Sequence, residues 1–228
     1  MKKILTTLAA VLCCAAMFSS CNKDNPNPEP ADGWVDLGLP SGLLWAACNL
    51  GADSPEGYGD YFAWSETATK RLYDWSTYRY CTVDAEGELA TLTKYNISTD
   101  YGTVDNLTTL DAVDDAAAVR LGNGVRIPTM DEWIELAYNT TTEWTTQNGV
   151  AGYRLTASNG NSLFLPAAGF LYGSDHDCAD SSGHYWSASL DTDIPYGARY
   201  FYFDSEDWGE GSGYRFSGAS VRAVKKAN

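Results

Sequence analysis

The second half of the chain alternates apolar and polar residues, and this pattern constrains the fold more than any other feature of the sequence. After Asn139 the period is two residues, which is the repeat of a β-strand with one buried face. Two strands are expected at residues 152–157 and 162–166, because Asn159-Gly160 between them is a strong hairpin signal. Further strands are expected at residues 185–189, 199–203 and 220–224.

Two helices are expected before this region. The first covers residues 110–121, because the alanines at 116–118 favour helix and Gly122 stops it. The second follows Thr129, which can form a T-x-x-E capping box with Glu132. Its buried face is expected to consist of Met130, Trp133, Ile134 and Ala137.

Short strands are also expected near the start of the domain, at residues 34–37, 43–47 and 61–64. Together with the two helices, they predict an α+β fold with many short antiparallel strands and long loops.

The first twenty residues are typical of an export signal. Two lysines precede an apolar stretch at residues 4–18, which is too short for a comfortable membrane span. Small residues and then Cys21 follow, an order similar to a bacterial lipoprotein signal, in which the cysteine is lipidated and becomes the mature N-terminus. We expect a signal peptide at residues 1–20, a lipidated flexible tether at 21–33 and one domain at 34–228. Ordinary secretion with cleavage nearby is the alternative.

The tether favours the lipoprotein interpretation. Residues 22–32, NKDNPNPEPAD, hold three prolines and no large apolar side chain, so they should be extended. The Lys23-Asp24 pair just after the anchor resembles signals that route Bacteroidetes-type lipoproteins to the cell surface. The expected location is the outer membrane, lipid-anchored and surface-exposed, with the lipid as the only membrane contact.

The charge and the cysteines agree with export. The chain has 30 acidic and 15 basic side chains, a net charge of −15, which disfavours nucleic acid as a partner. Cys48, Cys81 and Cys178 remain in the domain, and none belongs to a C-x-x-C pair. They permit at most one internal disulfide, with its pairing open.

Long motifs run through nearly the whole domain, at residues 35–67, 74–81 (DWSTYRYC), 114–136 (DDAAAVRLGNGVRIPTMDEWIEL), 185–189 (YWSAS) and 216–224 (FSGASVRAV). They resemble the Fibrobacter succinogenes major paralogous domain. The resemblance implies a C-type-lectin-like fold of the kind shared with the formylglycine-generating enzymes. The R-I-P-T-x-x-E-W segment is similar to a motif of those enzymes, but its residues are explained by a strand-to-helix joint.

An enzymatic role is not expected. The formylglycine-generating enzymes need a cysteine pair near the C-terminal end of the domain, and no cysteine follows Cys178 here. Proteins that share a fold can have unrelated functions. In addition, no G-x-S-x-G, H-E-x-x-H or phosphate-loop motif is present. We therefore expect no catalytic residues.

A metal site is a weaker hypothesis, on the loop around residues 173–186. His176, Cys178 and His184 could ligate zinc, whereas Asp175, Asp177 and Asp180 could ligate calcium. A solvated polar loop is the alternative, because the ligand spacing matches no established pattern. No cofactor is expected, although calcium stays possible.

The C-terminal loops are the expected binding region. In the strand at 199–203 the phenylalanines should face the core, while Tyr200 and Tyr202 point outward with Asp204 in phase and Trp208 just beyond. The expected ligand-binding residues are Tyr196, Arg199, Tyr200, Tyr202, Asp204, Asp207, Trp208 and Tyr214.

Three functions follow in order of preference. The first is a non-catalytic envelope lipoprotein that binds a glycan or protein ligand. The second is a structural or adhesin-type surface component without a small-ligand site. The third is an enzyme related to the formylglycine generators.

Overall fold

The computed structural model describes residues 33–122 and 124–227. The expected signal peptide, the lipidation site Cys21 and nearly all of the tether lie outside the described residues. The two α-helices are α1 (Ala116–Leu121) and α2 (Met130–Tyr138), and the 3-10 helices are η1 (Trp75–Thr77) and η2 (Thr99–Tyr101). The strands are β1 (Trp34–Asp36), β2 (Leu43–Ala46), β3 (Tyr61–Phe62), β4 (Cys81–Val83), β5 (Leu89–Leu92), β6 (Thr140–Gln147), β7 (Val150–Ala157), β8 (Ser162–Pro166), β9 (Ala168–Tyr172), β10 (Asp175–Ala179), β11 (Ser182–Leu190), β12 (Gly197–Asp204), β13 (Trp208–Tyr214), β14 (Ala219–Ser220) and β15 (Val224–Lys226).

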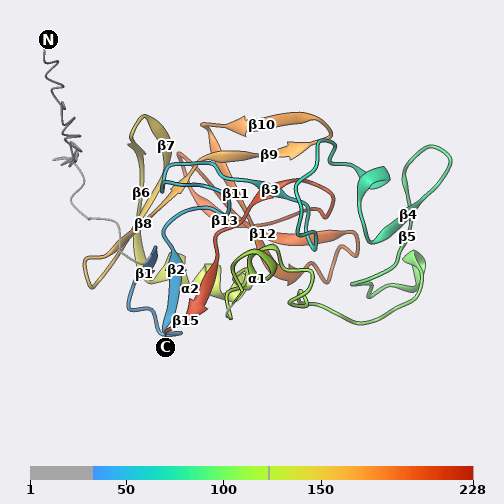
Figure 1. Ribbon diagram of the computed structural model, residues 1–228, viewed down its shortest axis with the longest axis horizontal. Helices are drawn as coiled ribbons and strands as arrows, with labels where there is room; N and C mark the ends of the chain where they lie inside the picture. The colour runs from blue at the N-terminus through green and yellow to red at the C-terminus, as the bar shows by residue number, and fades with distance from the viewer. Residues whose placement is uncertain (1–32, 123, 228) are drawn as a thin grey trace, which may run out of the picture.

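The strands form four sheets, as expected for an α+β fold. The largest has the order β10-β9-β11-β12-β13, with β14 and β3 attached beside β11. The smaller sheets are β1-β2-β15, β6-β7-β8 and the β4-β5 hairpin. Strand pairs are antiparallel, except that β11 runs parallel to β9 and to β14. Figure 1 shows the β4-β5 hairpin at the opposite end of the molecule from β1.

Residues close together in the sequence were enough to predict the β7-β8 hairpin and the start of the second helix. β7 and β8 pair in register across Asn159-Gly160, and the backbone N–H of Gly160 donates to the Ala157 carbonyl at 3.0 Å. The capping box of α2 is present, because the Thr129 hydroxyl accepts from the Glu132 N–H and the Glu132 carboxylate accepts from the Thr129 N–H. Both predictions are confirmed.

The first helix is shorter than predicted. It begins at Ala116 rather than at Leu110, because Asp115 is its N-cap and accepts from the N–H groups of Ala117 and Ala118. The Leu110 N–H donates instead to the Ala188 carbonyl of β11 at 3.0 Å. A tertiary hydrogen bond thus outweighs helix propensity over residues 110–115.

The strand expected at residues 220–224 is also divided. Ser220 pairs with β3 and β11, whereas Val224 pairs with Trp45 of β2 in another sheet. The chain therefore crosses between two sheets at residues 221–223, which places the side chain of Arg222 in the interior at 0% exposure.

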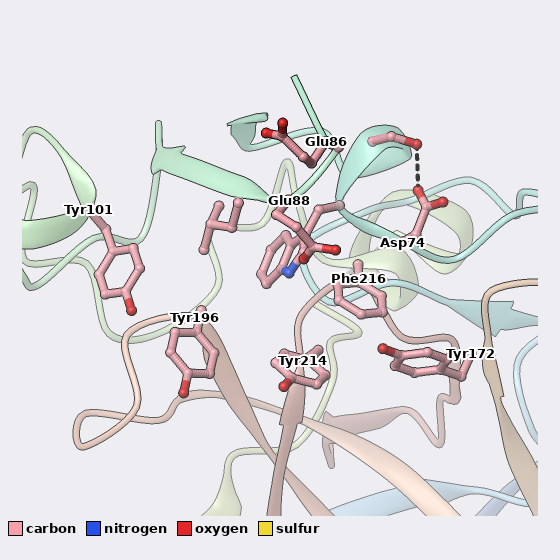
Figure 2. Close-up of a pocket in the computed structure, with 12 residues that line it drawn as sticks. Asp74, Glu86, Glu88, Tyr101, Tyr172, Tyr196, Tyr214 and Phe216 are labelled. Carbon is pink, nitrogen blue, oxygen red and sulfur yellow. Dashed lines mark hydrogen bonds between the residues drawn. The ribbon is translucent and has the colours of Figure 1, made fainter. Parts of the chain in front are cut away.

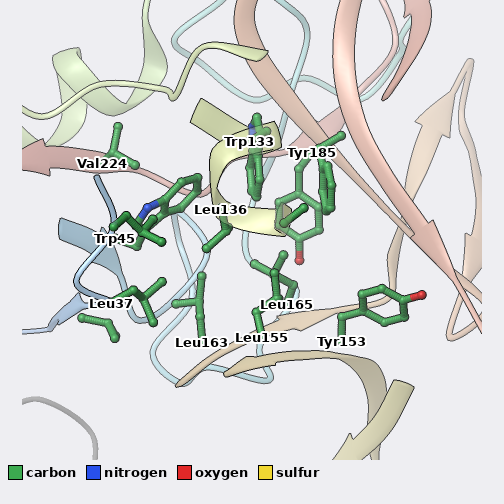
Figure 3. Close-up of a cluster of buried hydrophobic side chains, with 14 of the residues drawn as sticks. Leu37, Trp45, Trp133, Leu136, Tyr153, Leu155, Leu163, Leu165, Tyr185 and Val224 are labelled. Atoms are coloured by element: carbon green, nitrogen blue, oxygen red, sulfur yellow. The ribbon is translucent and has the colours of Figure 1, made fainter. Parts of the chain in front are cut away.

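The main core lies between α2, β11, β12 and the β6-β7-β8 sheet (Figure 3). The Trp133 ring of α2 stacks on Phe201 with ring centroids 5.0 Å apart and contacts Trp45 at 4.8 Å. Phe201 and Phe203 are fully buried, as the strand alternation predicts. Within residues 33–122 and 124–227, no helix is both long enough and apolar enough to span a membrane.

Candidate ligand-binding groove

Side chains from six separate segments line an open groove of about 490 Å³. The segments are η1, the β4-β5 turn, η2, the end of β9, the residue before β12 and the end of β13 with the turn after it. We call it the aromatic groove, lined by Asp74, Trp75, Ser76, Glu86, Gly87, Glu88, Leu89, Tyr101, Tyr172, Tyr196, Tyr214 and Phe216.

Six aromatic side chains form a continuous array along one wall of this groove. Tyr214 is the centre of the array, because its ring stacks on Phe216 at 5.1 Å and on Tyr196 at 5.7 Å between centroids. Tyr101 continues the array beyond Tyr196, also at 5.7 Å. Figure 2 shows Tyr101, Tyr196, Tyr214 and Tyr172 in a row across the groove.

The local geometry of β13 explains why these rings are displayed. Tyr214 is the last residue of β13, and a turn follows in which the Ser217 N–H donates to the Tyr214 carbonyl at 2.9 Å. The Phe216 ring, which belongs to this turn, lies parallel to the Tyr214 ring. Phe216 is buried beside Trp75, at 4.9 Å between centroids. Tyr214 rests on this buried pair and is 45% exposed, so its ring is anchored while part of it remains accessible.

Carboxylates line the opposite wall, as Figure 2 shows for Asp74, Glu86 and Glu88. Asp74 caps η1, accepting from the Thr77 N–H at 3.1 Å and from the Ser76 hydroxyl at 2.7 Å. The carboxylates of Glu86 and Glu88 are exposed and have no hydrogen-bond partner within the described part of the chain. They can therefore accept hydrogen bonds from a ligand.

The turn that carries these two glutamates is internally braced. The Asp84 carboxylate accepts from the N–H groups of Glu86 and Glu88, at 3.0 and 2.9 Å. The Asp84 N–H in turn donates to the Glu88 carbonyl at 2.9 Å. These bonds hold the turn over the aromatic groove and leave the glutamate side chains to face it.

A second, smaller hollow lies next to the aromatic groove and shares Tyr172 and Tyr214 with it. Its volume is about 260 Å³. We call it the tyrosine pocket, lined by Phe170, Tyr172, His184, Trp186, Tyr200, Gly213, Tyr214, Ser217 and Ala219.

The structure brings together some of the residues predicted to bind ligand. Tyr196 and Tyr214 line the aromatic groove, and Tyr200 lines the tyrosine pocket. Tyr202 lies beside Tyr200, with ring centroids 6.3 Å apart, and packs over Gly209 of β13. Both tyrosines lie on the face of β12 opposite Phe201 and Phe203, as expected. They do not point outward, because Tyr200 packs against a second buried cluster that contains Trp186, and both side chains are half-buried.

Trp208 and Arg199 lie on the other face of the sheet, which corrects the prediction of a single binding face. Trp208 pairs with Phe203 and packs against Phe201, with ring centroids 5.7 Å apart. Arg199 forms an ion pair with Glu210 across the β12-β13 ladder. The strand alternation changes its phase at the turn between β12 and β13, so Trp208 faces the core side.

Asp204 and Asp207 shape that turn. The Asp204 carboxylate accepts from the N–H groups of Glu206 and Asp207, at 2.8 and 3.1 Å. The Asp207 carboxylate accepts from the Trp208 N–H at 2.8 Å. Neither side chain lines the aromatic groove or the tyrosine pocket.

The residues considered for a metal do not converge. Asp175 and Asp177 belong to β10, whereas Asp180 accepts a hydrogen bond from the Tyr58 hydroxyl. His176 Nε2 lies 2.9 Å from the Tyr61 hydroxyl and 2.8 Å from the Ala168 carbonyl oxygen. Among the described residues, no three ligating side chains come together as a metal site would require.

The three cysteines of the domain are not joined to one another by a disulfide. The Cys81 thiol donates to the carbonyls of Trp75 and Tyr78, at 3.2 and 3.4 Å, which links β4 to η1 beside the groove. Cys178 is exposed in β10, and Cys48 is partly buried against the main core.

Several groove residues were missed by the sequence analysis. They are Trp75, Tyr101, Tyr172, Phe216 and the glutamates 86 and 88. They come from five separate segments, and no local spacing links one segment to another.

Comparison of the chain with protein-family models, with curated proteins and with solved structures gave no match.

Proposed function

We propose that this protein is a non-catalytic envelope lipoprotein that binds a neutral extracellular saccharide in the aromatic groove. The observation that carries the proposal is the array of tyrosine rings facing unpartnered carboxylates across a space of about 490 Å³. That volume lies within the range of small-molecule sites.

The chemistry of the two walls matches the two sides of a sugar ring. A sugar presents an apolar C–H face and a rim of hydroxyl groups. Tyrosine rings supply rigid apolar area with a polar tip, and the exposed ring of Tyr214 is available for such stacking. The carboxylates of Glu86 and Glu88 would accept hydrogen bonds from the hydroxyl groups of the same sugar.

Charge narrows the ligand class further. The groove contains carboxylates and no lysine or arginine, and the whole chain has a net charge of −15. An anionic sugar would therefore meet repulsion without a compensating cation. A neutral saccharide fits this lining best.

The location of the groove suits an anchored protein. Figure 1 shows β1, which follows the first described residue, at the opposite end from the β4-β5 hairpin that covers the groove. If Cys21 carries lipid at the outer membrane, the groove lies at the end of the domain remote from the anchored N-terminus. The α+β arrangement is also compatible with the C-type-lectin-like fold of the Fibrobacter succinogenes major paralogous domain, and we propose membership in that family.

Loss of the Tyr214 ring should abolish most saccharide binding. We expect purified full-length protein to bind neutral glycans on an array, and Tyr214→Ala to weaken the best interaction by about thirtyfold, the effect of a hot-spot aromatic residue. Tyr138→Ala is the matched control, because Tyr138 is 75% exposed and lies on α2, outside the groove.

Either of two results would overturn the proposal. One is the absence of binding to any neutral glycan. The other is a glycan signal that Tyr214→Ala and Tyr138→Ala affect equally.

Lipidation is tested separately at Cys21. Cys21→Ser should remove the acceptor thiol, so the protein should lose its incorporation of radiolabelled palmitate and leave the membrane fraction. A Cys48→Ser control should keep both. Retention of label and membrane association by Cys21→Ser would contradict the anchor.

A further inference from the structure

The tyrosine pocket differs chemically from the aromatic groove that it adjoins. Its lining contains aromatic side chains and small residues, with no carboxylate, lysine or arginine. His184 contacts Phe170 at 4.9 Å and Tyr200 at 5.1 Å between ring centroids. Burial lowers the pKa of His184 to about 4, so the imidazole is neutral near pH 7. The pocket therefore offers an uncharged lining in a strongly acidic protein.

The pocket is open because β13 carries a glycine at its floor. A Cβ atom added at Gly213 would lie 3.0 Å from Cε1 of Tyr200 and 3.6 Å from Cη2 of Trp186. Any side chain here would thus crowd the Tyr200 ring and contact the Trp186 ring. Ser217 and Ala219, also small, complete the floor.

Its size indicates what it can hold. A dry apolar cavity of about 150 Å³ accommodates benzene, and the tyrosine pocket measures about 260 Å³. One aromatic ring with a small substituent fits this space. Rings prefer edge-to-face or offset contacts with other rings, and Phe170, Trp186 and Tyr200 provide them.

The tyrosine pocket and the aromatic groove lie side by side. Tyr172 and Tyr214 line both spaces, and their ring centroids are 6.4 Å apart. Figure 2 shows these two rings next to each other on one side of the groove. A group attached directly to a sugar in the groove would reach the pocket past this shared wall.

We propose that the tyrosine pocket is a subsite for an uncharged aromatic substituent on the saccharide held in the aromatic groove. The preferred ligand is then an aryl glycoside rather than an unsubstituted sugar. This inference rests on the proposed function, since the sugar places the substituent at the pocket.

The test compares matched glycosides by isothermal titration calorimetry on full-length protein. Methyl and 4-nitrophenyl glycosides of the same neutral sugar serve as probes, together with free 4-nitrophenol. We expect the aryl form to bind about tenfold more tightly than the methyl form, because it alone buries a ring in the pocket.

Two variants test whether the tighter binding of the aryl glycoside comes from the tyrosine pocket. Phe170→Ala, which removes one wall, and Gly213→Ala, which crowds Tyr200, should each remove the aryl advantage. Both should keep the affinity for the methyl glycoside, because neither residue lines the groove. The melting temperature of each variant shows whether it is folded, and the two changes perturb different strands.

The outcomes separate the two proposals. If methyl glycosides bind and aryl forms bind no more tightly, the subsite is overturned and the groove stands. An aryl advantage that survives both variants overturns the subsite as well. If no glycoside binds, or only free 4-nitrophenol does, the saccharide function is overturned and the subsite with it.

Discussion

Arg222→Met is expected to destabilise the domain by about 4 kcal/mol or more, the range in which buried networks are broken. The Arg222 guanidinium donates twice to Oδ1 of Asn49, at 2.9 and 2.7 Å. It also donates to the carbonyls of Ala46, Ala47 and Phe164, at 3.0, 2.6 and 2.9 Å. These five hydrogen bonds end on four acceptor atoms in β2, the segment after it and β8, so one side chain joins two sheets.

The expected loss is large because no water can replace the guanidinium. Arg222 has 0% exposure, so methionine would fill part of the volume and leave buried carbonyl oxygens without donors. The free energy of unfolding from urea titration measures the effect. Arg71→Met is the control, since Arg71 is exposed and should change stability by less than about 0.5 kcal/mol. Equal stability of the two variants would contradict the assigned role.

Asp114→Ala is expected to cost about 3 kcal/mol, as for removal of one partner from a buried ion pair. The Asp114 carboxylate is 1% exposed and accepts from Lys94 Nζ at 2.6 Å and from the Tyr95 hydroxyl at 2.8 Å. The Tyr80 hydroxyl donates to its other oxygen. This network connects the segment before α1 to residues 80–95, which support the groove. Asp53→Ala, at an exposed position, is the control.

The Asp114 contribution should also depend on pH. Burial acts to raise the pKa of this carboxyl, but the hydrogen bonds from Lys94, Tyr80 and Tyr95 outweigh it and hold the pKa below its usual value. A carboxyl with a lowered folded-state pKa stabilises the protein above its unfolded pKa of about 3.9 and loses that contribution as the pH falls through the folded value. The stability gap between wild type and Asp114→Ala should therefore be constant from pH 7 to pH 5 and narrow below about pH 4. A gap that narrows between pH 7 and pH 5 would be inconsistent with this network.

Local chemistry made parts of the fold predictable. The Asn159-Gly160 turn, the Thr129-Glu132 capping box and the burial of Phe201 and Phe203 all depend on residues close together in sequence. Each of these features depends on interactions within one turn or one strand, so the sequence alone was enough to predict it.

β13 was missed because its glycines hide the strand pattern. In WGEGSGY, positions 209, 211 and 213 are glycine, which is typical of loops. The reason is tertiary: the Tyr200 and Tyr202 rings of β12 lie over these positions, and a Cβ at Gly211 would come within 2.6 Å of Tyr200. The rings on the neighbouring strand leave room only for glycine at these positions. The sequence of β13 alone does not show this requirement.

The groove could be predicted only in part. Tyr196 and Tyr214 were identified from their aromatic character in the C-terminal region, but the facing carboxylates come from the β4-β5 turn, more than a hundred residues earlier in the chain. Trp208 was assigned to the wrong face because alternation was continued through the turn that Asp204 and Asp207 shape. Long-range assembly and turn geometry thus set the limits of the sequence analysis.

The most direct test of the saccharide groove is a heteronuclear NMR titration of full-length protein with a neutral glycan that it binds. Binding in the aromatic groove should shift the signals of the Trp75 indole N–H, the amides of residues 86–89 and the rings of Tyr196 and Tyr214, and leave those of β6 and β10 unchanged. Shifts confined to other surfaces, such as β10 or the turn at residues 204–208, would contradict the assignment of the site.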